Sequence, residues 1–237
     1  MIKVSVGAVK NVVLVGAHCD DIAIGAGATL MQLTRENPDV VVHALVLTGA
    51  GTEREVEEKN AFVSMCGSAE VRLTVADLPD GRLPQHWGDV KARLADFSAS
   101  CEPDLVFAPH RRDSHQDHRL IAELMPTEFR NHFILGYEIL KWESDLPNPN
   151  IYQPIEHETA LGKVALLHDC YRSQTTRGWF DTEAFLGVMR MRGVQCHNRY
   201  AESFAAEKIV VHLGGLASAQ PPPNVTSPTP SLEQIGS

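Results

Sequence analysis

The feature that most limits the fold of this chain is an alternation of short apolar runs with longer helical segments between residues 12 and 108. Four runs rich in Val, Leu and Ala are typical of buried strands: residues 12–15, 40–47, 71–75 and 105–108. Three segments between them have a helical pattern: residues 25–36, 54–67 and 87–100. Strands that alternate with helices form βαβ units, in which the strands run parallel. The sequence therefore predicts an α/β fold with a mainly parallel sheet flanked by helices.

The second half of the chain is less regular. Three further helices and one strand are predicted there, the helices at residues 118–124, 163–171 and 182–192 and the strand at residues 133–139. Between these segments, prolines interrupt the pattern after Lys141. Residues 217–237 are rich in Pro, Ser and Thr, a composition that cannot bury a core. We predict a single domain over residues 1–216, followed by a disordered tail over residues 217–237.

Composition excludes several classes of protein. Apolar residues make up 43% of the 237 residues, enough for the core of one domain. The net charge of -9 and the lack of a basic run argue against a nucleic-acid partner. No apolar stretch is long enough for a membrane span, and no secretory signal precedes the first strand. The five cysteines are scattered and form no CxxC pair, as in reducing compartments. We expect a cytoplasmic protein, for which a homo-oligomer is compatible with the sequence.

Two short segments are rich in residues that bind metals. His18-Cys19-Asp20-Asp21 follows the first predicted strand, and residues 110–118, with the sequence HRRDSHQDH, follow the fourth. Open α/β sheets place their sites in loops at the carboxyl ends of parallel strands. The two segments would therefore meet at one metal ion, although they are about ninety positions apart. An isolated Asp-Asp pair is usually a helix cap, but here both clusters follow buried strands.

The residue types indicate a catalytic metal. His18 and Asp21, three positions apart, would face one point at the start of a helix, and His118 would supply a third ligand. Two imidazoles and one carboxylate, with room for water, are typical of a catalytic zinc site. Such a metal lowers the pKa of bound water and polarises a carbonyl group. Asp20 would then act as the general base on the metal-bound water.

The second motif offers supporting groups. His115 lies one helical turn before His118 and would face the developing oxyanion. Asp117 or Asp113 would accept a hydrogen bond from a ligand histidine and orient its ring.

These motifs resemble those of the PIG-L/LmbE family of zinc-dependent N-deacetylases. The first family motif resembles residues 18–21 together with residues 24–30 (IGAGATL), and the second resembles residues 115–118 (HQDH). Two further family segments are weaker signals. One of them resembles residues 78–81 (LPDG). The other resembles Arg54 and Glu57, which precede Cys66-Gly67. The resemblance covers roughly residues 10–145.

The resemblance implies a Rossmann-like fold and removal of an N-acyl group, typically acetyl, from a glucosamine-type sugar. It implies the same roles as the chemistry does: His18, Asp21 and His118 as Zn²⁺ ligands, Asp20 as base and His115 as oxyanion stabiliser. Another divalent metal such as Fe²⁺ is the alternative. It also makes Arg54 and Asp80 candidates for binding sugar hydroxyls or a substrate anion. The small-molecule substrate would be an amino sugar, free or linked to a nucleotide or lipid.

Two positions depart from the family pattern. Cys19 stands where proline is common, and Ile22 stands where glutamate is common. Cys19 is interpreted as a small packing residue, with a thiolate ligand or nucleophile as the alternative. The loss of the acid at position 22 would remove a group near the metal but no ligand.

Three further residues are candidates for substrate binding. Tyr137 and Lys141 would line a sugar cleft, or would pack in the ordinary way with their polar ends at the surface. Arg112, next to Arg111, would attract a phosphate-bearing substrate or neutralise the aspartates of the motif.

Two other functions remain open from the sequence. The same metal site would serve an amidase that acts on a thiol conjugate or on an amide of secondary metabolism. A degenerate site would leave a non-catalytic sugar-binding module.

Overall fold

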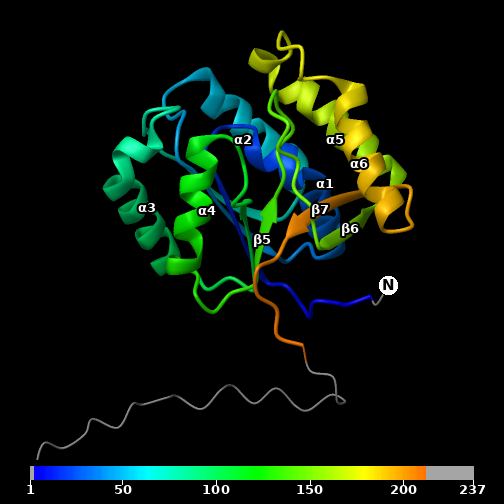
Figure 1. Cartoon of the computed structure of the whole chain (residues 1–237), viewed down its shortest axis with the longest axis horizontal. Coiled ribbons are helices and arrows are strands. Elements are labelled where there is room, and N and C mark those ends of the chain that lie inside the picture. The colour runs from blue at the N-terminus through cyan, green and yellow to red at the C-terminus, as the bar shows by residue number, and fades with distance from the viewer. Residues whose placement is uncertain (1–2, 212–237) are drawn as a thin grey trace, which may run out of the picture.

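The computed structural model describes residues 3–211 and shows one sheet between two layers of helices (Figure 1). Its strands are β1 (Asn11–Gly16), β2 (Val41–Val46), β3 (Glu70–Val75), β4 (Leu105–Pro109), β5 (Ile134–Tyr137), β6 (Ile151–Ile155) and β7 (Tyr200–Ala205). Its α-helices are α1 (Asp21–Glu36), α2 (Glu53–Cys66), α3 (Trp87–Ala99), α4 (Gln116–Glu128), α5 (His157–Cys170) and α6 (Thr182–Gln195). Two short 3-10 helices are η1 (Leu83–His86) and η2 (Arg172–Gln174). The predicted single-domain α/β fold is confirmed.

The order of the strands creates a place for a site. The sheet has the order β3-β2-β1-β4-β5-β7-β6, in which the first five strands run parallel. β7 runs antiparallel to both of its neighbours. The chain builds the sheet outward from β1 in one direction and then returns to place β4 on the other side of β1. Ligands of open α/β sheets bind at such a reversal, outside the carboxyl ends of the two strands.

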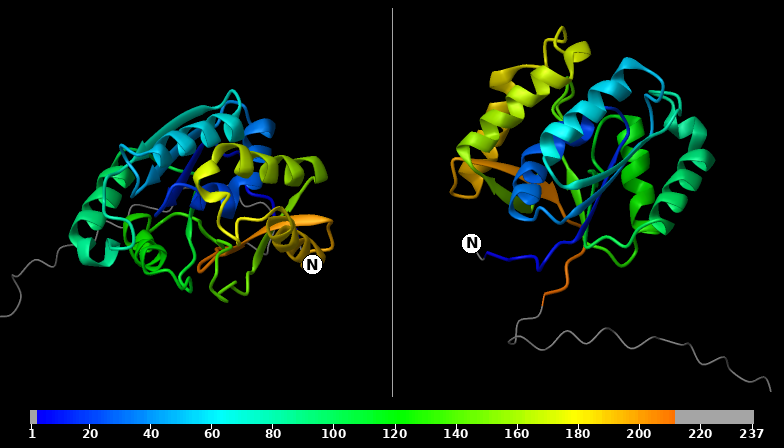
Figure 2. Two further views of the ribbon diagram at one scale, coloured as in Figure 1. Left: turned by 90° about the horizontal axis from the view of Figure 1, so that it is seen from above. Right: turned by 180° about the vertical axis from the view of Figure 1, so that it is seen from behind.

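Both faces of the central sheet are covered, which explains the continuous apolar run in β1. Val12 and Leu14 belong to the core under α1, α2 and α5, whereas Val13 and Val15 belong to the core under α3 and α4. Figure 2 shows these two layers of helices from two further directions. A strand buried on both faces has no polar alternation.

Among the described residues, no helix is long and apolar enough to cross a membrane.

The structure corrects several predicted boundaries. α1 begins at Asp21 instead of Gly25, because the amide of Ile24 already donates to the carbonyl of Asp20. α4 begins at Gln116, two residues before the predicted start, and α5 begins at His157.

The strands β6 and β7 were not predicted at all. The tail predicted for residues 217–237 lies outside the described residues, as does the end of the predicted domain at residues 212–216.

Candidate metal centre

The two motif segments lie side by side at the carboxyl ends of β1 and β4. These strands pair directly, in a register that joins Leu14 to Phe107. The first segment turns sharply into α1, and Asp20 in this turn has a φ of 122°. Such a backbone conformation is rare for a residue other than glycine and recurs at functional sites. The second segment leads into α4, with His115 at its N-cap.

His18, Asp21 and His118 present three donor atoms at the spacing that a tetrahedral metal requires. His18 Nδ1 lies 3.1 Å from His118 Nε2. Asp21 Oδ2 lies 3.3 Å from His118 Nε2 and 3.5 Å from His18 Nδ1. Zinc bonds to nitrogen and oxygen of about 2.0–2.1 Å place tetrahedral ligand atoms about 3.4 Å apart. The residues present therefore fit a zinc ion.

The fold holds Asp21 in its position. Its Oδ2 atom accepts hydrogen bonds of 2.9 Å from the backbone amides of Ala17 and His18. Burial alone would raise the pKa of Asp21, but His118 and His18 outweigh this effect and hold the pKa well below its ordinary value. Burial opposes the charged form of His118, yet Asp21 and Asp113 raise its pKa to about 9. The carboxylates of Asp21 and Asp113 thus favour positive charge at this site.

The second nitrogen of each predicted ligand histidine, His18 and His118, faces a carboxylate. His118 Nδ1 lies 3.0 Å from Asp113 Oδ2. His18 Nε2 lies 3.2 Å from Asp117 Oδ2 and 3.1 Å from Asp80 Oδ1. Such carboxylates fix the tautomer and the ring orientation of histidines that bind metals. Asp113 and Asp117 thus lie where they would orient one histidine each, and Asp80 lies beside the same ring as Asp117.

Two other donor groups share His18. In the first group, one ring nitrogen from each of His18, His115 and His118 lies within 4.8 Å of the other two. In the second, a ring nitrogen of His18 and one carboxylate oxygen from each of Asp80 and Asp117 lie equally close together. We favour Asp21 as the third ligand over His115, because the three distances among His18, Asp21 and His118 match the edges of one tetrahedron.

The surroundings of His115 define its tautomer. Its Nδ1 atom accepts the backbone amide of Asp117 at 3.3 Å, which leaves Nε2 to carry the proton of the neutral ring. Burial lowers the pKa of His115, and the neighbouring rings of His118 and His18 lower it further. In the neutral ring, His115 would thus present its Nε2–H group beside the rings of His18 and His118.

Asp20 lies against Arg54. Its Oδ2 atom is 3.0 Å from Arg54 Nη2, which also donates to the carbonyl of Cys19. Burial raises the pKa of Asp20 to about 7, against the opposing effect of Arg54. The thiol of Cys19 is buried and donates to the carbonyl of Thr48 at 3.6 Å. Burial raises the pKa of this thiol, as expected for a packing residue and not for a thiolate.

The predicted substrate-binding residues are dispersed. Arg112 is exposed at the end of β4. Lys141 Nζ lies 3.0 Å from Asp113 Oδ2 and 2.6 Å from Asp145 Oδ2, so this lysine pairs with the carboxylate that lies beside His118.

Tyr137 is buried in the core and not in a cleft. Its hydroxyl donates to the carbonyl of Val15 at 2.6 Å. A Cβ atom on Gly25 would lie 2.3 Å from the Tyr137 ring, so this motif glycine makes room for the tyrosine. The ring packs in the core as in the packing alternative, but the hydroxyl is buried and does not reach the surface.

Sequence reasoning missed Glu58. This residue is fully buried, and Tyr171 donates a hydrogen bond of 2.6 Å to its Oε2 atom. Burial raises its pKa to about 8. The spacing of four residues from Arg54 on one helix was a signal that could have placed both side chains on the same face of α2.

Comparisons with known proteins find similar sequences. The sequence model of the PIG-L family, described as GlcNAc-PI de-N-acetylase, matches residues 13–127. The Escherichia coli protein YaiS, described as an uncharacterized deacetylase, is 29% identical over 171 residues, which cover 67% of this chain and 89% of YaiS.

Solved structures with the same fold include enzymes that catalyse different reactions. The N,N'-diacetylchitobiose deacetylase of Pyrococcus horikoshii has a TM-score of 0.60 at 22% identity and covers 84% of each chain. The 4-carboxy-2-hydroxymuconate hydratase GalB of Pseudomonas putida has a TM-score of 0.69 at 20% identity, over 88% of this chain and 100% of GalB. Because a deacetylase and a hydratase both match, the fold alone does not determine the reaction.

Proposed function

We propose that this chain, whose residues 13–127 match the model of the PIG-L family, is a metal-dependent deacetylase that acts on the N-acetyl group of an amino sugar. The observation that carries the proposal is the triangle of donor atoms from His18, Asp21 and His118, with Asp20 and His115 beside it. The family description and the annotation of YaiS as a deacetylase support the reaction class.

The residues would hold zinc, with Fe²⁺ as the alternative. Two imidazoles and one carboxylate leave a fourth position open, as in catalytic zinc sites. When bound, such an ion would lower the pKa of a water molecule and polarise the amide carbonyl.

Asp20 would be the general base. It would accept a proton from the water that attacks the amide carbonyl, and the same proton would pass to the nitrogen as the C–N bond breaks. The products would be acetate and the free amine. Arg54 would hold the carboxylate of Asp20 in position throughout.

His115 would stabilise the oxyanion. Its Nδ1 atom already accepts a backbone amide, so the Nε2–H group is free to donate. A donor that is fixed before the reaction stabilises developing charge without reorganisation.

The test combines metal analysis with measurement of acetate release. Purified protein is assayed on free, nucleotide-linked and inositol-linked N-acetylglucosamine, before and after chelation. We expect about one equivalent of zinc per chain, and acetate release that is lost on chelation and restored by metal.

Substitution of the base tests its role separately. Asp20→Asn should keep the metal while acetate release falls by about 10²-fold or more. Asp89→Asn, an exposed site on α3, is the matched control. Substantial activity in Asp20→Asn would remove Asp20 from the mechanism.

The metal analysis and the acetate assay also separate the alternative functions. Bound metal without acetate release from any sugar would direct the search to thiol-conjugate or secondary-metabolite amides. A folded protein that binds no metal after reconstitution would contradict the proposal and favour a sugar-binding module.

A further inference from the structure

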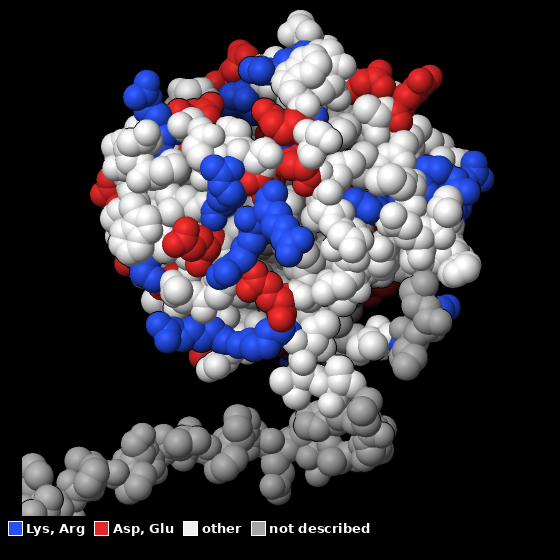
Figure 3. Space-filling model, in the orientation of Figure 1, with Lys and Arg blue, Asp and Glu red and all other residues white. Residues whose placement is uncertain are grey.

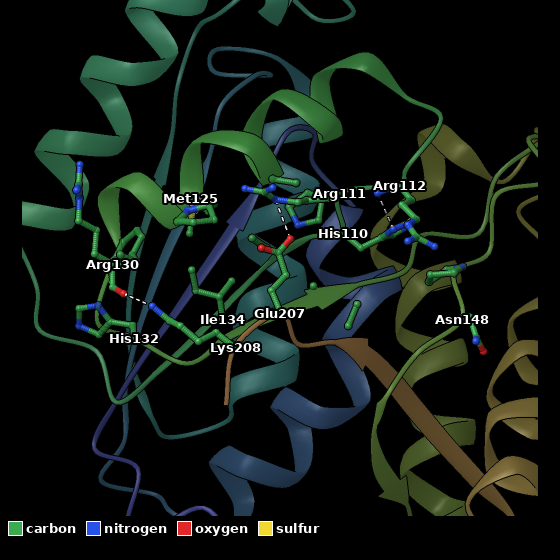
Figure 4. Close-up of a pocket in the computed structure, with 18 residues that line it drawn as sticks. His110, Arg111, Arg112, Met125, Arg130, His132, Ile134, Asn148, Glu207 and Lys208 are labelled. Carbon is green, nitrogen blue, oxygen red and sulfur yellow. Dashed lines mark hydrogen bonds and ion pairs between the residues drawn. The ribbon is translucent and has the colours of Figure 1, made fainter. Parts of the chain in front are cut away.

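A cavity of about 680 Å³ lies beside α4, away from the predicted metal ligands (Figure 4). Its walls come from β4, α4, β5 and the segment that follows β7. It lies on the side of the sheet that carries α3 and α4, and none of His18, Asp21 and His118 lines it. Cavities of roughly 300–1,000 Å³ are typical of small-molecule sites.

The middle of the cavity is apolar. Ala108 and Ile134 contribute from the sheet, and Met125 and Phe129 contribute from α4. These side chains belong to, or pack against, the core between the sheet and α3 and α4. Because Ala108, Met125 and Phe129 are each only 1% exposed, an apolar ligand body would lie against the half-buried Ile134 and Pro126, which line the same cavity.

Cationic side chains surround this apolar wall. Arg111, Arg112, Arg130 and Lys208 all line the cavity, and Glu207 is its one acidic lining residue within the described part of the chain. Figure 3 shows Lys and Arg side chains gathered on the face over α4 and the loop from α4 to β5. In a chain with a net charge of -9, this local excess of positive charge favours an anion.

These cations are available to a ligand. Within residues 3–211, no carboxylate lies within ion-pair distance of Arg112 or Lys208, and Lys208 Nζ donates only to the carbonyl of Arg130, at 2.8 Å. Arg111 pairs with Glu207 at 2.7 Å, and both side chains are about half exposed, at 49% and 56%. Exposed pairs contribute little stability, so the carboxylate of an incoming molecule would readily replace Glu207.

We propose that this cavity is a second binding site, separate from the metal centre, for a small organic anion. The ligand carries a carboxylate or phosphate group on an apolar body. The anionic group contacts Arg111, Arg112 or Lys208, and the apolar body lies against Pro126 and Ile134. In Figure 4, Arg112 lies toward one end of the cavity and Lys208 toward the other, with Arg111 between them.

Calorimetry on the full chain with four probes tests the chemistry: hexyl phosphate, hexanoate, inorganic phosphate and hexanol. Hexyl phosphate or hexanoate should bind at least about tenfold more tightly than inorganic phosphate and hexanol, because only these two probes use both the cations and the apolar wall. The stronger of the two identifies the anionic group. Equal binding of inorganic phosphate and hexyl phosphate would overturn the amphiphilic site.

Variants place the binding in the cavity. Arg112→Ala/Lys208→Ala should weaken the stronger probe at least about tenfold, since both side chains are exposed and the fold should be kept. Arg72→Ala/Arg93→Ala, at exposed positions elsewhere, is the matched control. His118→Ala should leave the affinity unchanged.

Two results would contradict the proposal. Loss of binding in His118→Ala would place the anion at the metal centre. If Arg112→Ala/Lys208→Ala changes the oligomeric state in light scattering but leaves the affinity for the probe unchanged, the cavity is a contact between copies of the chain.

Discussion

Arg54 is the residue whose surroundings differ most from its expected role. The sequence resemblance made it a candidate for binding sugar hydroxyls or a substrate anion. In the structure its guanidinium points back to Asp20 and to the carbonyl of Cys19, and Nε lies 3.5 Å from Glu57. The N–H donors of Arg54 thus connect the turn that carries Asp20, the proposed base, to helix α2. This geometry is that of a positioning residue.

Arg54→Lys tests this role. Lysine keeps the charge but cannot present two donors in a fixed plane to Asp20 and Cys19. We expect kcat for deacetylation to fall by about 10²-fold because the base is misplaced, while KM and metal content change little. A rise in KM with unchanged kcat would instead assign Arg54 to substrate binding. Steady-state kinetics and metal analysis on the same preparation distinguish the two results.

At the level of elements, the sequence was most informative where strands lead directly into motifs. β1 and β4 are continuous apolar runs because both faces of the sheet are covered, and their ends mark the two motif loops without further information. The convergence of His18 and His118 then followed from sheet topology alone. The contacts of Arg54 could not be predicted from sheet topology, because they depend on how α2 lies against the turn at Asp20.

β6 and β7 could not be predicted for a physical reason. β6 contains Pro154 and is only partly buried, so its apolar pattern is weak. β7 has buried polar residues, Glu202 and Ser203, where a strand usually has apolar ones. Glu202 is stabilised there by partners on α1 and α5, which are distant in sequence. A local pattern cannot show such compensation.

The contact between α2 and the end of α5 predicts a pH dependence of stability. Glu58 on α2 has a pKa of about 8 in the folded chain, because it is buried, against about 4.3 when unfolded. Between these values the folded state holds a proton that the unfolded state has lost. The free energy of unfolding therefore decreases as pH rises through this window. Below it, the contribution of Glu58 is complete.

Glu58→Gln should remove this dependence. The amide retains an acceptor for Tyr171 but cannot ionise, so the variant should gain Tm relative to the parent chain as pH rises from about 5 to 8. Thermal unfolding at several pH values measures the difference. Glu123→Gln, at an exposed position on α4, is the control for the loss of a surface charge. Parallel Tm curves for Glu58→Gln and the parent chain would show that Glu58 is ionised in the fold.

At the level of the whole molecule, a buried ion pair joins the parallel part of the sheet to its antiparallel extension. Lys163 Nζ on α5 lies 2.5 Å from Glu202 Oε1 on β7. The same nitrogen donates to the carbonyl of Ile24 at 2.5 Å. The carboxylate of Glu202 also accepts the amides of Ala28 and Thr29 in α1. One buried cluster thus holds together the helix that follows the first motif, a helix of the second half and the added strand. Removal of the cation should therefore destabilise both halves of the fold.

Lys163→Met is the test of this coupling. It leaves Glu202 buried without its cation, which should cost roughly 3–5 kcal/mol and lower Tm by about 10 °C in a chain of this size. Lys59→Met removes the exposed pair with Glu55 and should cost less than about 1 kcal/mol. Lys163→Met/Glu202→Gln should recover part of the loss, because the penalty comes from the unpaired charge and not from the missing contact. A single unfolding transition in calorimetry would show that β6 and β7 unfold with the rest of the sheet. Equal Tm values for the two single variants would mean that the buried pair does not hold the halves together.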